Sequence, residues 1–102
     1  MPVYMLVEAK TRDPEKYQQY ISQVSRLVTQ HGGRYLVRGG KITPLGDAWK
    51  PERIIILEFP SEDNIRAWLA SPEYRAVAPL REAGAETRAV LLEGYDAKGC
   101  PQ

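Results

Sequence analysis

The chain has 102 residues, of which 43% are hydrophobic and 26% charged, so disordered and fibrous classes are excluded and one domain is expected. Fourteen Lys and Arg against thirteen Asp and Glu leave a net charge of +1. A partner recognised mainly by bulk charge, such as duplex nucleic acid or an anionic membrane, is therefore not expected.

The first predicted element is a strand over Val3–Lys10, which is rich in β-forming residues. The apolar run over residues 2–7 is too short for a signal peptide or a membrane span, so we expect a cytoplasmic protein.

Asp13-Pro14-Glu15 predicts the start of a helix, because Asp13 can accept amide hydrogen bonds and proline suits the first helical position. Gly32-Gly33 predicts its end. The apolar side chains between these signals recur with the 3.6-residue period of a helix packed on one side. They are Tyr17, Tyr20, Ile21, Val24, Leu27, Val28 and His31.

A short strand over Arg34–Arg38 follows, and Gly39-Gly40 interrupts it. Residues 41–51 then form an excursion, in which Lys41–Leu45 has the composition of a further short strand. The third main strand is Arg53–Phe59, which Pro60 ends.

Ser61 and Ser71 are predicted to cap two consecutive helical segments, and Pro79 should break or kink the second. The last predicted strand is Thr87–Tyr95, and residues 96–102 form a tail with the single cysteine, Cys100. One cysteine excludes an internal disulfide, and one His with one Cys cannot build an ordinary structural zinc site.

The order β-α-β-β-α-β predicts a single ferredoxin-like α+β domain over residues 1–95, with a four-stranded antiparallel sheet. Ile54–Leu57 and Ala89–Leu92 do not alternate apolar with polar residues, so both faces of these strands favour burial. Because two helices cover only one face, we expect a second copy on the other, and hence a homodimer. RNA-recognition domains share this order, but they need stacking aromatics on the central strands, where this chain has Ile and Leu.

Three blocks of sequence resemble the family known as "domain of unknown function 1330". The first block is residues 32–40. The second, within residues 49–61, comprises Trp49–Arg53 and Glu58–Ser61. The third, within residues 67–81, comprises Ala67-Trp68, Ser71–Tyr74 and Pro79–Arg81. The resemblance implies a subunit of the dimeric α/β-barrel superfamily. That superfamily includes cofactor-free monooxygenases, lactone isomerases, dehydratases, haem enzymes and stress proteins.

His31 and Glu58 are the candidates for proton transfer. His31 has the only side chain with an unperturbed pKa near neutrality, although at the end of a helix it can equally cap carbonyl groups.

Glu8 and Glu58 are expected to share one edge of the sheet, on the assumption that their strands run parallel. Repulsion between two close carboxylates would raise the pKa of one of them, as a general acid or base requires. Alternatively, Glu58 forms an ion pair with Arg34 on the adjacent strand.

The candidates for substrate binding are arginines and large aromatics. Arg38 is expected near Arg53, and the two could clamp a carboxylate or phosphate; Arg81 is a third anion contact. Trp68 and Tyr74 could wall a pocket, and Trp49 needs cover over a pocket or on a partner. Ordinary ion pairs and core packing are the alternatives for all of them.

The sequence therefore favours a homodimer with a small-molecule pocket, used by a cofactor-independent isomerase, dehydratase or monooxygenase. The alternative is a dimeric binding or stress-response module without catalysis. We expect no cofactor and no metal, because no glycine-rich phosphate loop, metal-ligand cluster or Ser-His-Asp spacing is present in the sequence. The near-neutral charge and the short apolar run likewise predict no nucleic-acid and no membrane partner.

Overall fold

The computed structural model describes residues 2–95, and the predicted tail with Cys100 lies outside them. The order of elements is βαββαβ with the second helix in two parts, as the sequence predicted. The elements are β1 (Val3–Thr11), α1 (Pro14–Gln30), β2 (Arg34–Arg38), β3 (Arg53–Phe59), α2 (Glu62–Ala70), α3 (Pro72–Gly84) and β4 (Ala85–Glu93).

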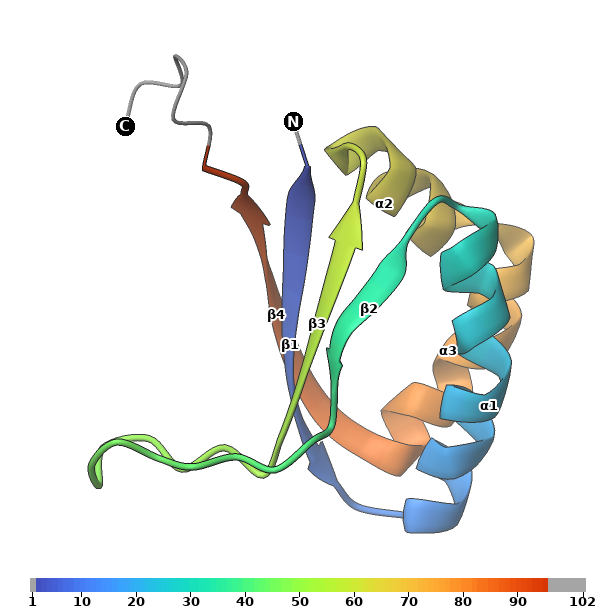
Figure 1. Cartoon of the computed structure of the whole chain (residues 1–102). Coiled ribbons are helices and arrows are strands. Elements are labelled where there is room, and N and C mark those ends of the chain that lie inside the picture. The colour runs from blue at the N-terminus through green and yellow to red at the C-terminus, as the bar shows by residue number, and fades with distance from the viewer. Residues whose placement is uncertain (1, 96–102) are drawn as a thin grey trace.

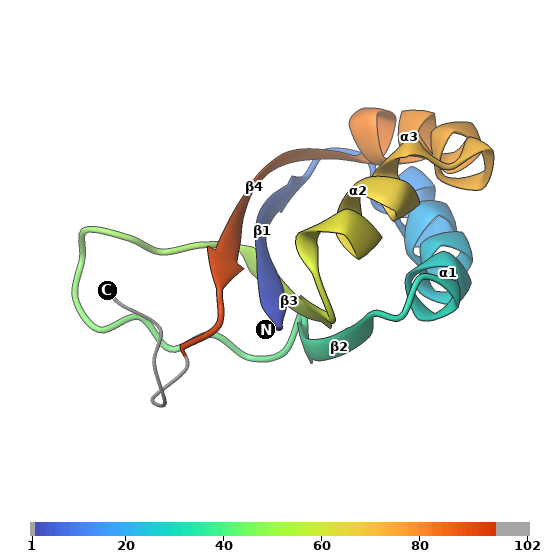
Figure 2. The ribbon, with the colours of Figure 1, turned by 90° about the horizontal axis from the view of Figure 1, so that it is seen from above.

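The four strands form one antiparallel sheet in the order β2-β3-β1-β4, and all three helices lie on one side of it (Figure 1). From above, the curved sheet and the helices enclose the core between them (Figure 2). The expectation that the strands of Glu8 and Glu58 run parallel is wrong. In the antiparallel β1–β3 register, Glu8 lies opposite Ile54 and Glu58 opposite Tyr4. The two carboxylates are thus four residues apart along the sheet, or about 13 Å.

The helix boundaries follow the capping signals in the sequence. The Asp13 side chain accepts a hydrogen bond from the Lys16 amide at 3.2 Å, and Ser71 accepts one from the Tyr74 amide at 3.1 Å. Gly32 has a φ of +85°, the left-handed conformation that glycine adopts without steric cost, and it leads the chain out of α1.

The structure differs from two predictions about local structure, that of a strand over Lys41–Leu45 and that of a break at Pro79. Lys41–Leu45 is not a strand, because residues 40–52 project beyond the sheet as an arm where no strand lies beside them (Figure 1). Pro79 does not break α3, which runs through it from Pro72 to Gly84. Pro79 and Arg75 are both exposed, so Pro79, which has no amide to donate to the Arg75 carbonyl group, lies on the solvent side of α3.

The sheet has a helix side and an open side. Alternate residues of β1 and β3, among them Ala9, Leu57 and Phe59, are buried under the helices. The residues between them face away from the helices and form what we call the open face. It consists of Tyr4, Leu6, Glu8, Val37, Ile54, Ile56, Glu58, Arg88, Val90 and Leu92.

A β-bulge in β2 decides which of its side chains face the helices. The register with β3 shifts between Tyr35 and Val37, so that Leu36 is an extra residue. Without the bulge, residues 35 and 38 would point to opposite faces of the sheet. With it, Tyr35 and Arg38 both face the helices.

Candidate functional site

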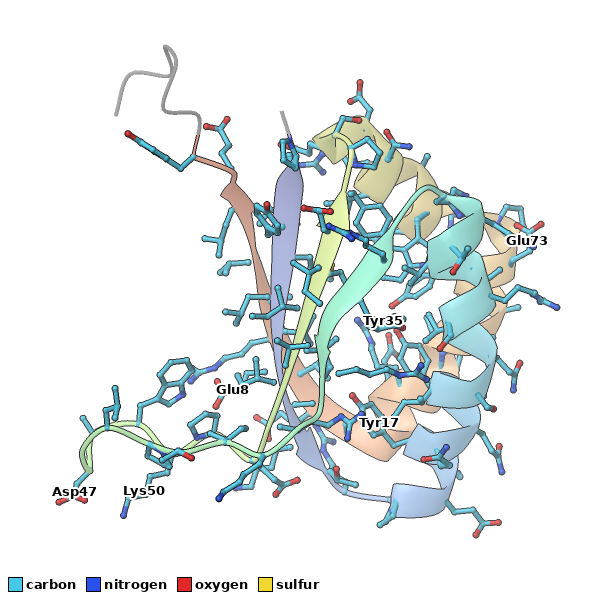
Figure 3. All side chains as sticks on the ribbon, viewed as in Figure 1. Glu8, Tyr17, Tyr35, Asp47, Lys50 and Glu73 are labelled. Atoms are coloured by element: carbon cyan, nitrogen blue, oxygen red, sulfur yellow. The ribbon has the colours of Figure 1, made fainter. Side chains whose placement is uncertain are left out.

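A cavity of about 60 Å³ lies between the helix side of the sheet and the three helices. Every helix and every strand contributes to its wall. The lining residues are Met5, Val7, Tyr17, Tyr20, Ile21, Val24, Tyr35, Arg38, Arg53, Ile55, Leu57, Trp68, Tyr74, Arg81, Thr87 and Ala89. In Figure 3, Tyr17 and Tyr35 lie on the helix side of the sheet, whereas Glu8 lies on the open side.

An aromatic cluster forms one wall of the cavity. The rings of Trp68 and Tyr74 meet edge to face with centroids 5.0 Å apart, and the hydroxyl oxygens of Tyr74 and Tyr20 lie 3.1 Å apart. All three side chains are buried. Burial raises the pKa of Tyr20, and the neighbouring Tyr74 raises it further, so Tyr20 stays protonated at neutral pH.

Three arginines line the same cavity, and aromatic rings position two of them. The Arg38 guanidinium lies 4.8 Å from the centroid of the Tyr35 ring, which the bulge in β2 makes possible. The Arg53 guanidinium lies 5.6 Å from the centroid of the Tyr17 ring and packs against Gly39. Gly39 has a φ of +71°, and a Cβ there would collide with this guanidinium. Gly39 therefore makes room for Arg53.

Three buried hydrogen-bond donors of the cavity lack a partner within the described part of the chain. Arg53 Nε, Arg81 Nε and Trp68 Nε1 are buried and have no hydrogen-bond partner among residues 2–95. Burial raises the pKa of Tyr17, while the nearby Arg53 charge opposes that rise. The cavity can thus receive acceptor groups, above all negatively charged ones.

Four of the residues predicted for substrate binding line this cavity: Arg38, Trp68, Tyr74 and Arg81. Arg53, which the sequence placed near Arg38, lines it as well. Sequence reasoning missed Tyr17 and Tyr20 as cavity residues. Their helical spacing indicated an inward face, but such a pattern does not distinguish a packed core from a cavity wall.

The two residues predicted for proton transfer lie elsewhere. His31 is at the end of α1, where its Nδ1 is 2.8 Å from the carbonyl oxygen of Leu27. Glu58 is on the open face, and its Oε1 accepts a hydrogen bond from Arg34 Nε at 2.6 Å. This bond, together with one from Tyr4, lowers the pKa of Glu58. The structure thus supplies the capping contact and the ion pair that were the alternatives to catalysis.

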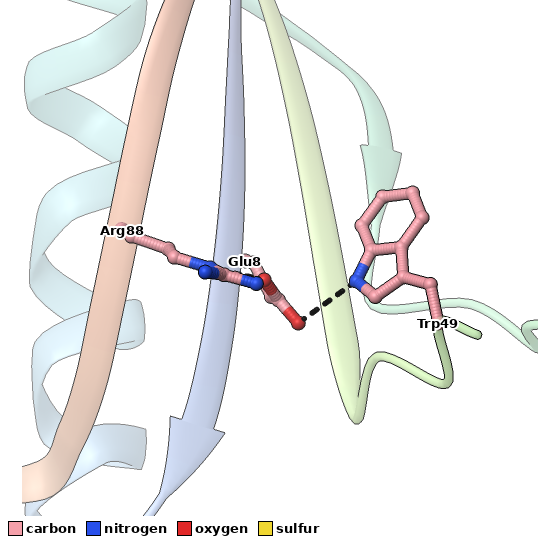
Figure 4. A network of polar contacts seen from close by, with 3 residues as sticks. All are labelled: Glu8, Trp49 and Arg88. Carbon is pink, nitrogen blue, oxygen red and sulfur yellow. Dashed lines mark hydrogen bonds and ion pairs between the residues drawn. The ribbon is translucent and has the colours of Figure 1, made fainter.

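Trp49 lies on the arm and reaches back to the open face. Its indole Nε1 donates to Glu8 Oε2 at 3.2 Å, and Arg88 Nε donates to Glu8 Oε1 at 2.6 Å (Figure 4). The hydrogen bond from Arg88, and secondarily that from Trp49, lowers the pKa of Glu8. Because Trp49 is on the side of the sheet opposite the cavity, it does not contribute to the cavity wall.

Within residues 2–95, no group of three or more His, Cys, Asp or Glu side chains could hold a metal ion. None of the described helices is long and apolar enough to cross a membrane.

The layers and strand order define a ferredoxin-like α+β protein, with a cavity between its sheet and its helices. Residues 2–95 match the family described as "Domain of unknown function (DUF1330)", and the chain belongs to that family. Comparison with curated protein sequences gives no match.

Solved structures similar to this chain share its fold. A protein of unknown function from Rhodopseudomonas palustris is 20% identical, with a TM-score of 0.78 over 93% of this chain and 83% of that one. A dimeric ferredoxin-like protein of unknown function from Jannaschia sp. is 13% identical, with a TM-score of 0.70 over 92% and 100%. SnoaB, a cofactor-independent oxygenase from Streptomyces nogalater, is 14% identical, with a TM-score of 0.64 over 95% and 96%.

Proposed function

We propose that the protein binds a small organic molecule in the cavity between its sheet and helices, and that it does so as a homodimer joined through the open face. The observation that supports the ligand site is the composition of the cavity wall. Apolar and aromatic side chains surround a few buried donors, which is the usual make-up of a small-molecule site.

A variant that fills the cavity tests this proposal. Val7 lines the cavity from β1, so Val7→Phe should occupy the space, whereas Val7→Ile should leave most of it open. A library of small carboxylic acids and neutral carbonyl compounds would be screened by thermal shift. We expect compounds that stabilise the wild type and Val7→Ile but not Val7→Phe. Stabilisation that persists in Val7→Phe, or no stabilisation of the wild type, would contradict the proposal.

The apolar character of the open face supports the dimer. Val37, Val90 and Leu92 are between 39% and 54% exposed in the single chain, and they lie on the same face as the central residues Leu6 and Ile56. Such a patch is typical of an interface between copies. Similar structures described as dimeric have the same fold.

The dimer is tested by placing a charge on the open face. Val90→Glu should convert a particle of twice 11.5 kDa into one of 11.5 kDa, because the carboxylate would have to be desolvated in the interface. Ala76→Glu, which adds the same charge on the exposed side of α3, is the matched control. Sedimentation velocity measures both. A wild-type monomer at micromolar concentration would refute the dimer.

A second candidate function is cofactor-independent catalysis, of the isomerase, dehydratase or monooxygenase type. It is favoured by the Tyr20–Tyr74 hydroxyl pair inside the cavity and by the similarity in fold to SnoaB. A protonated tyrosine beside arginines can donate to a substrate oxygen on which negative charge develops. Because His31 and Glu58 do not line the cavity, this proposal assigns proton donation to the tyrosines.

Catalysis is tested on the compounds that bind. Each would be incubated with the protein and followed by NMR for chemical conversion. Tyr20→Phe and Tyr74→Phe keep the rings and remove the hydroxyl groups, so we expect conversion to fall while binding changes less. Binding without any conversion would leave a binding module, and conversion unaffected by both variants would exclude the tyrosines as proton donors.

A further inference from the structure

The cavity combines an excess of positive charge with a lack of acidic partners. Arg38, Arg53 and Arg81 line it, and no Asp or Glu is among its lining residues. Within residues 2–95, the ion pairs found include neither Arg38 nor Arg53, and Arg81 has only a 3.8 Å contact with the exposed Glu82. By contrast, Arg34, Arg66 and Arg88 each pair with a carboxylate at 2.6 Å on the outside of the molecule.

The unpartnered groups define what a ligand must supply. Guanidinium and indole N–H groups are donors only, so the partners of Arg53 Nε, Arg81 Nε and Trp68 Nε1 must be acceptors. Water can accept these hydrogen bonds, but it cannot neutralise the half-buried guanidinium groups of Arg53 and Arg81; the third arginine, Arg38, is exposed to solvent. An anion does both, and a carboxylate matches the planar fork of arginine.

The arginines are held in place before any ligand arrives. Arg38 lies over Tyr35 and Arg53 over Tyr17, and the missing side chain of Gly39 leaves room for the Arg53 guanidinium. A site that is ordered in advance loses less conformational entropy on binding.

The size of the cavity limits the ligand. One water molecule needs roughly 10–15 Å³ of cavity volume, so a cavity of about 60 Å³ holds roughly four to six non-hydrogen atoms, each counted as the size of a water molecule. A short organic molecule fits this volume, whereas a nucleotide or a polycyclic substrate would extend beyond it.

From these observations, and on the basis of the proposed ligand site, we propose that the cavity binds a short-chain organic carboxylate that carries a second oxygen acceptor, such as a 2-oxo acid. The carboxylate engages the arginines, and the second oxygen accepts from one of the remaining buried donors, the Trp68 indole included.

Three probes of nearly equal size test this class: pyruvate, propionate without the keto oxygen, and pyruvamide without the charge. Binding would be measured by calorimetry and thermal shift on the full-length protein. We expect pyruvate to bind about tenfold more tightly than pyruvamide, because charge-assisted hydrogen bonds are lost in the neutral compound. Propionate should lie between them.

Variants assign the effect to particular side chains. Arg53→Ala should weaken pyruvate binding about tenfold or more, whereas Arg66→Ala, which removes an exposed arginine on α2, should leave it unchanged. Gly39→Ala keeps all the charges but displaces Arg53, so it should also weaken pyruvate binding. Trp68→Phe should reduce the preference for pyruvate over propionate. An Arg53→Ala variant that binds pyruvate as the wild type does would overturn the proposal.

The outcomes separate this proposal from the one it depends on. Equal binding of pyruvate and pyruvamide would overturn the anionic class, and tighter binding of benzoate than of pyruvate would overturn the short-chain class. In both cases the ligand site would stand. If no compound of the larger library stabilises the wild type without also stabilising Val7→Phe, the proposal of a ligand site in this cavity is itself contradicted.

Discussion

Six arginines of this chain fall into two groups that differ only in their surroundings. Arg34, Arg66 and Arg88 are 70–79% exposed and pair with carboxylates at 2.6 Å, the ordinary behaviour of surface arginines. Three others line a cavity without a carboxylate, and the structure holds two of them against tyrosine rings. Of these three, Arg38 is exposed, and Arg53 and Arg81 are half-buried. At the scale of single residues, the site is marked by arginines that lack a close carboxylate partner, since even Arg81 has only its 3.8 Å contact with Glu82.

The Arg34–Glu58 pair leads to a prediction about pH. Because Arg34 lowers the pKa of Glu58, the folded-state value lies below that of an unfolded glutamate, which is about 4.3. The stability that this pair contributes is therefore present above that pH and is lost as the pH falls through the folded-state pKa. NMR of the Glu58 carboxyl carbon should show a low midpoint in the wild type and a higher one in Arg34→Ala.

The same titration can contradict the ion pair. A wild-type midpoint above about 6 would show that desolvation dominates and would restore Glu58 as a candidate general base. Lys50→Ala, which removes an exposed lysine of the arm, is the control and should leave the midpoint unchanged.

At the scale of elements, the connection between α1 and β2 depends on close packing at Gly33. A Cβ at this position would lie 2.6 Å from the ring of Phe59, which is fully buried, and 2.9 Å from Val28. Gly33→Ala should therefore lower the free energy of unfolding by about 1–3 kcal/mol, as overpacking usually does.

Gly40→Ala provides a matched control for that substitution. Gly40 has open space around its Cβ position and no positive φ, so its replacement should change stability by no more than about 0.5 kcal/mol. Urea denaturation measures both variants. Equal stability of Gly33→Ala and Gly40→Ala would mean that Phe59 shifts freely, contrary to the packing described.

The elements themselves could largely be predicted from the sequence, because caps and periodicity are local signals. Asp13, Ser61 and Ser71 all cap helices as expected. What local signals lack is information about neighbours. Lys41–Leu45 has strand-like residues but no strand to pair with, and the bulge at Leu36 depends on the register with β3.

The site could be predicted only in part for the same reason. Trp68 and Tyr74 line the cavity because their helical spacing fixed their inward direction. The sequence does not reveal the direction of β1 relative to β3. A parallel pair would place Glu8 and Glu58 at one edge of the sheet, whereas the antiparallel pair places them near opposite ends of the strands. Arg38, Arg53 and Arg81 come from three different elements that meet at the cavity. Their spacing in the sequence therefore does not predict that they line the same site.

At the scale of the whole molecule, the arm and the open face lie on the same side of the sheet. Leu45 is fully exposed and Trp49 is 53% exposed on this projecting segment (Figure 2). A second sheet packed on the open face would lie about 10 Å away, beside the arm. The arm should therefore contact the partner subunit in the proposed dimer.

Leu45→Ser tests that contact. Burying a leucine contributes about 1.5–3 kcal/mol, so its loss should raise the dimer dissociation constant about tenfold or more, with the fold of each chain unchanged by circular dichroism. Analytical ultracentrifugation measures the constant. If Leu45→Ser dimerises like the wild type while Val90→Glu is monomeric, the open face forms the interface and the arm does not reach the partner.

The most direct test of the ligand site uses the two tryptophans of the chain. Trp68 Nε1 is buried in the cavity without a partner, whereas Trp49 Nε1 is bonded to Glu8 on the opposite side of the sheet. In a ¹H–¹⁵N NMR titration with pyruvate, the indole signal of Trp68 should shift and saturate while that of Trp49 stays in place. A Trp68 signal that does not move, or two signals that move together in proportion to the added salt, would contradict the binding of a short 2-oxo acid in this cavity.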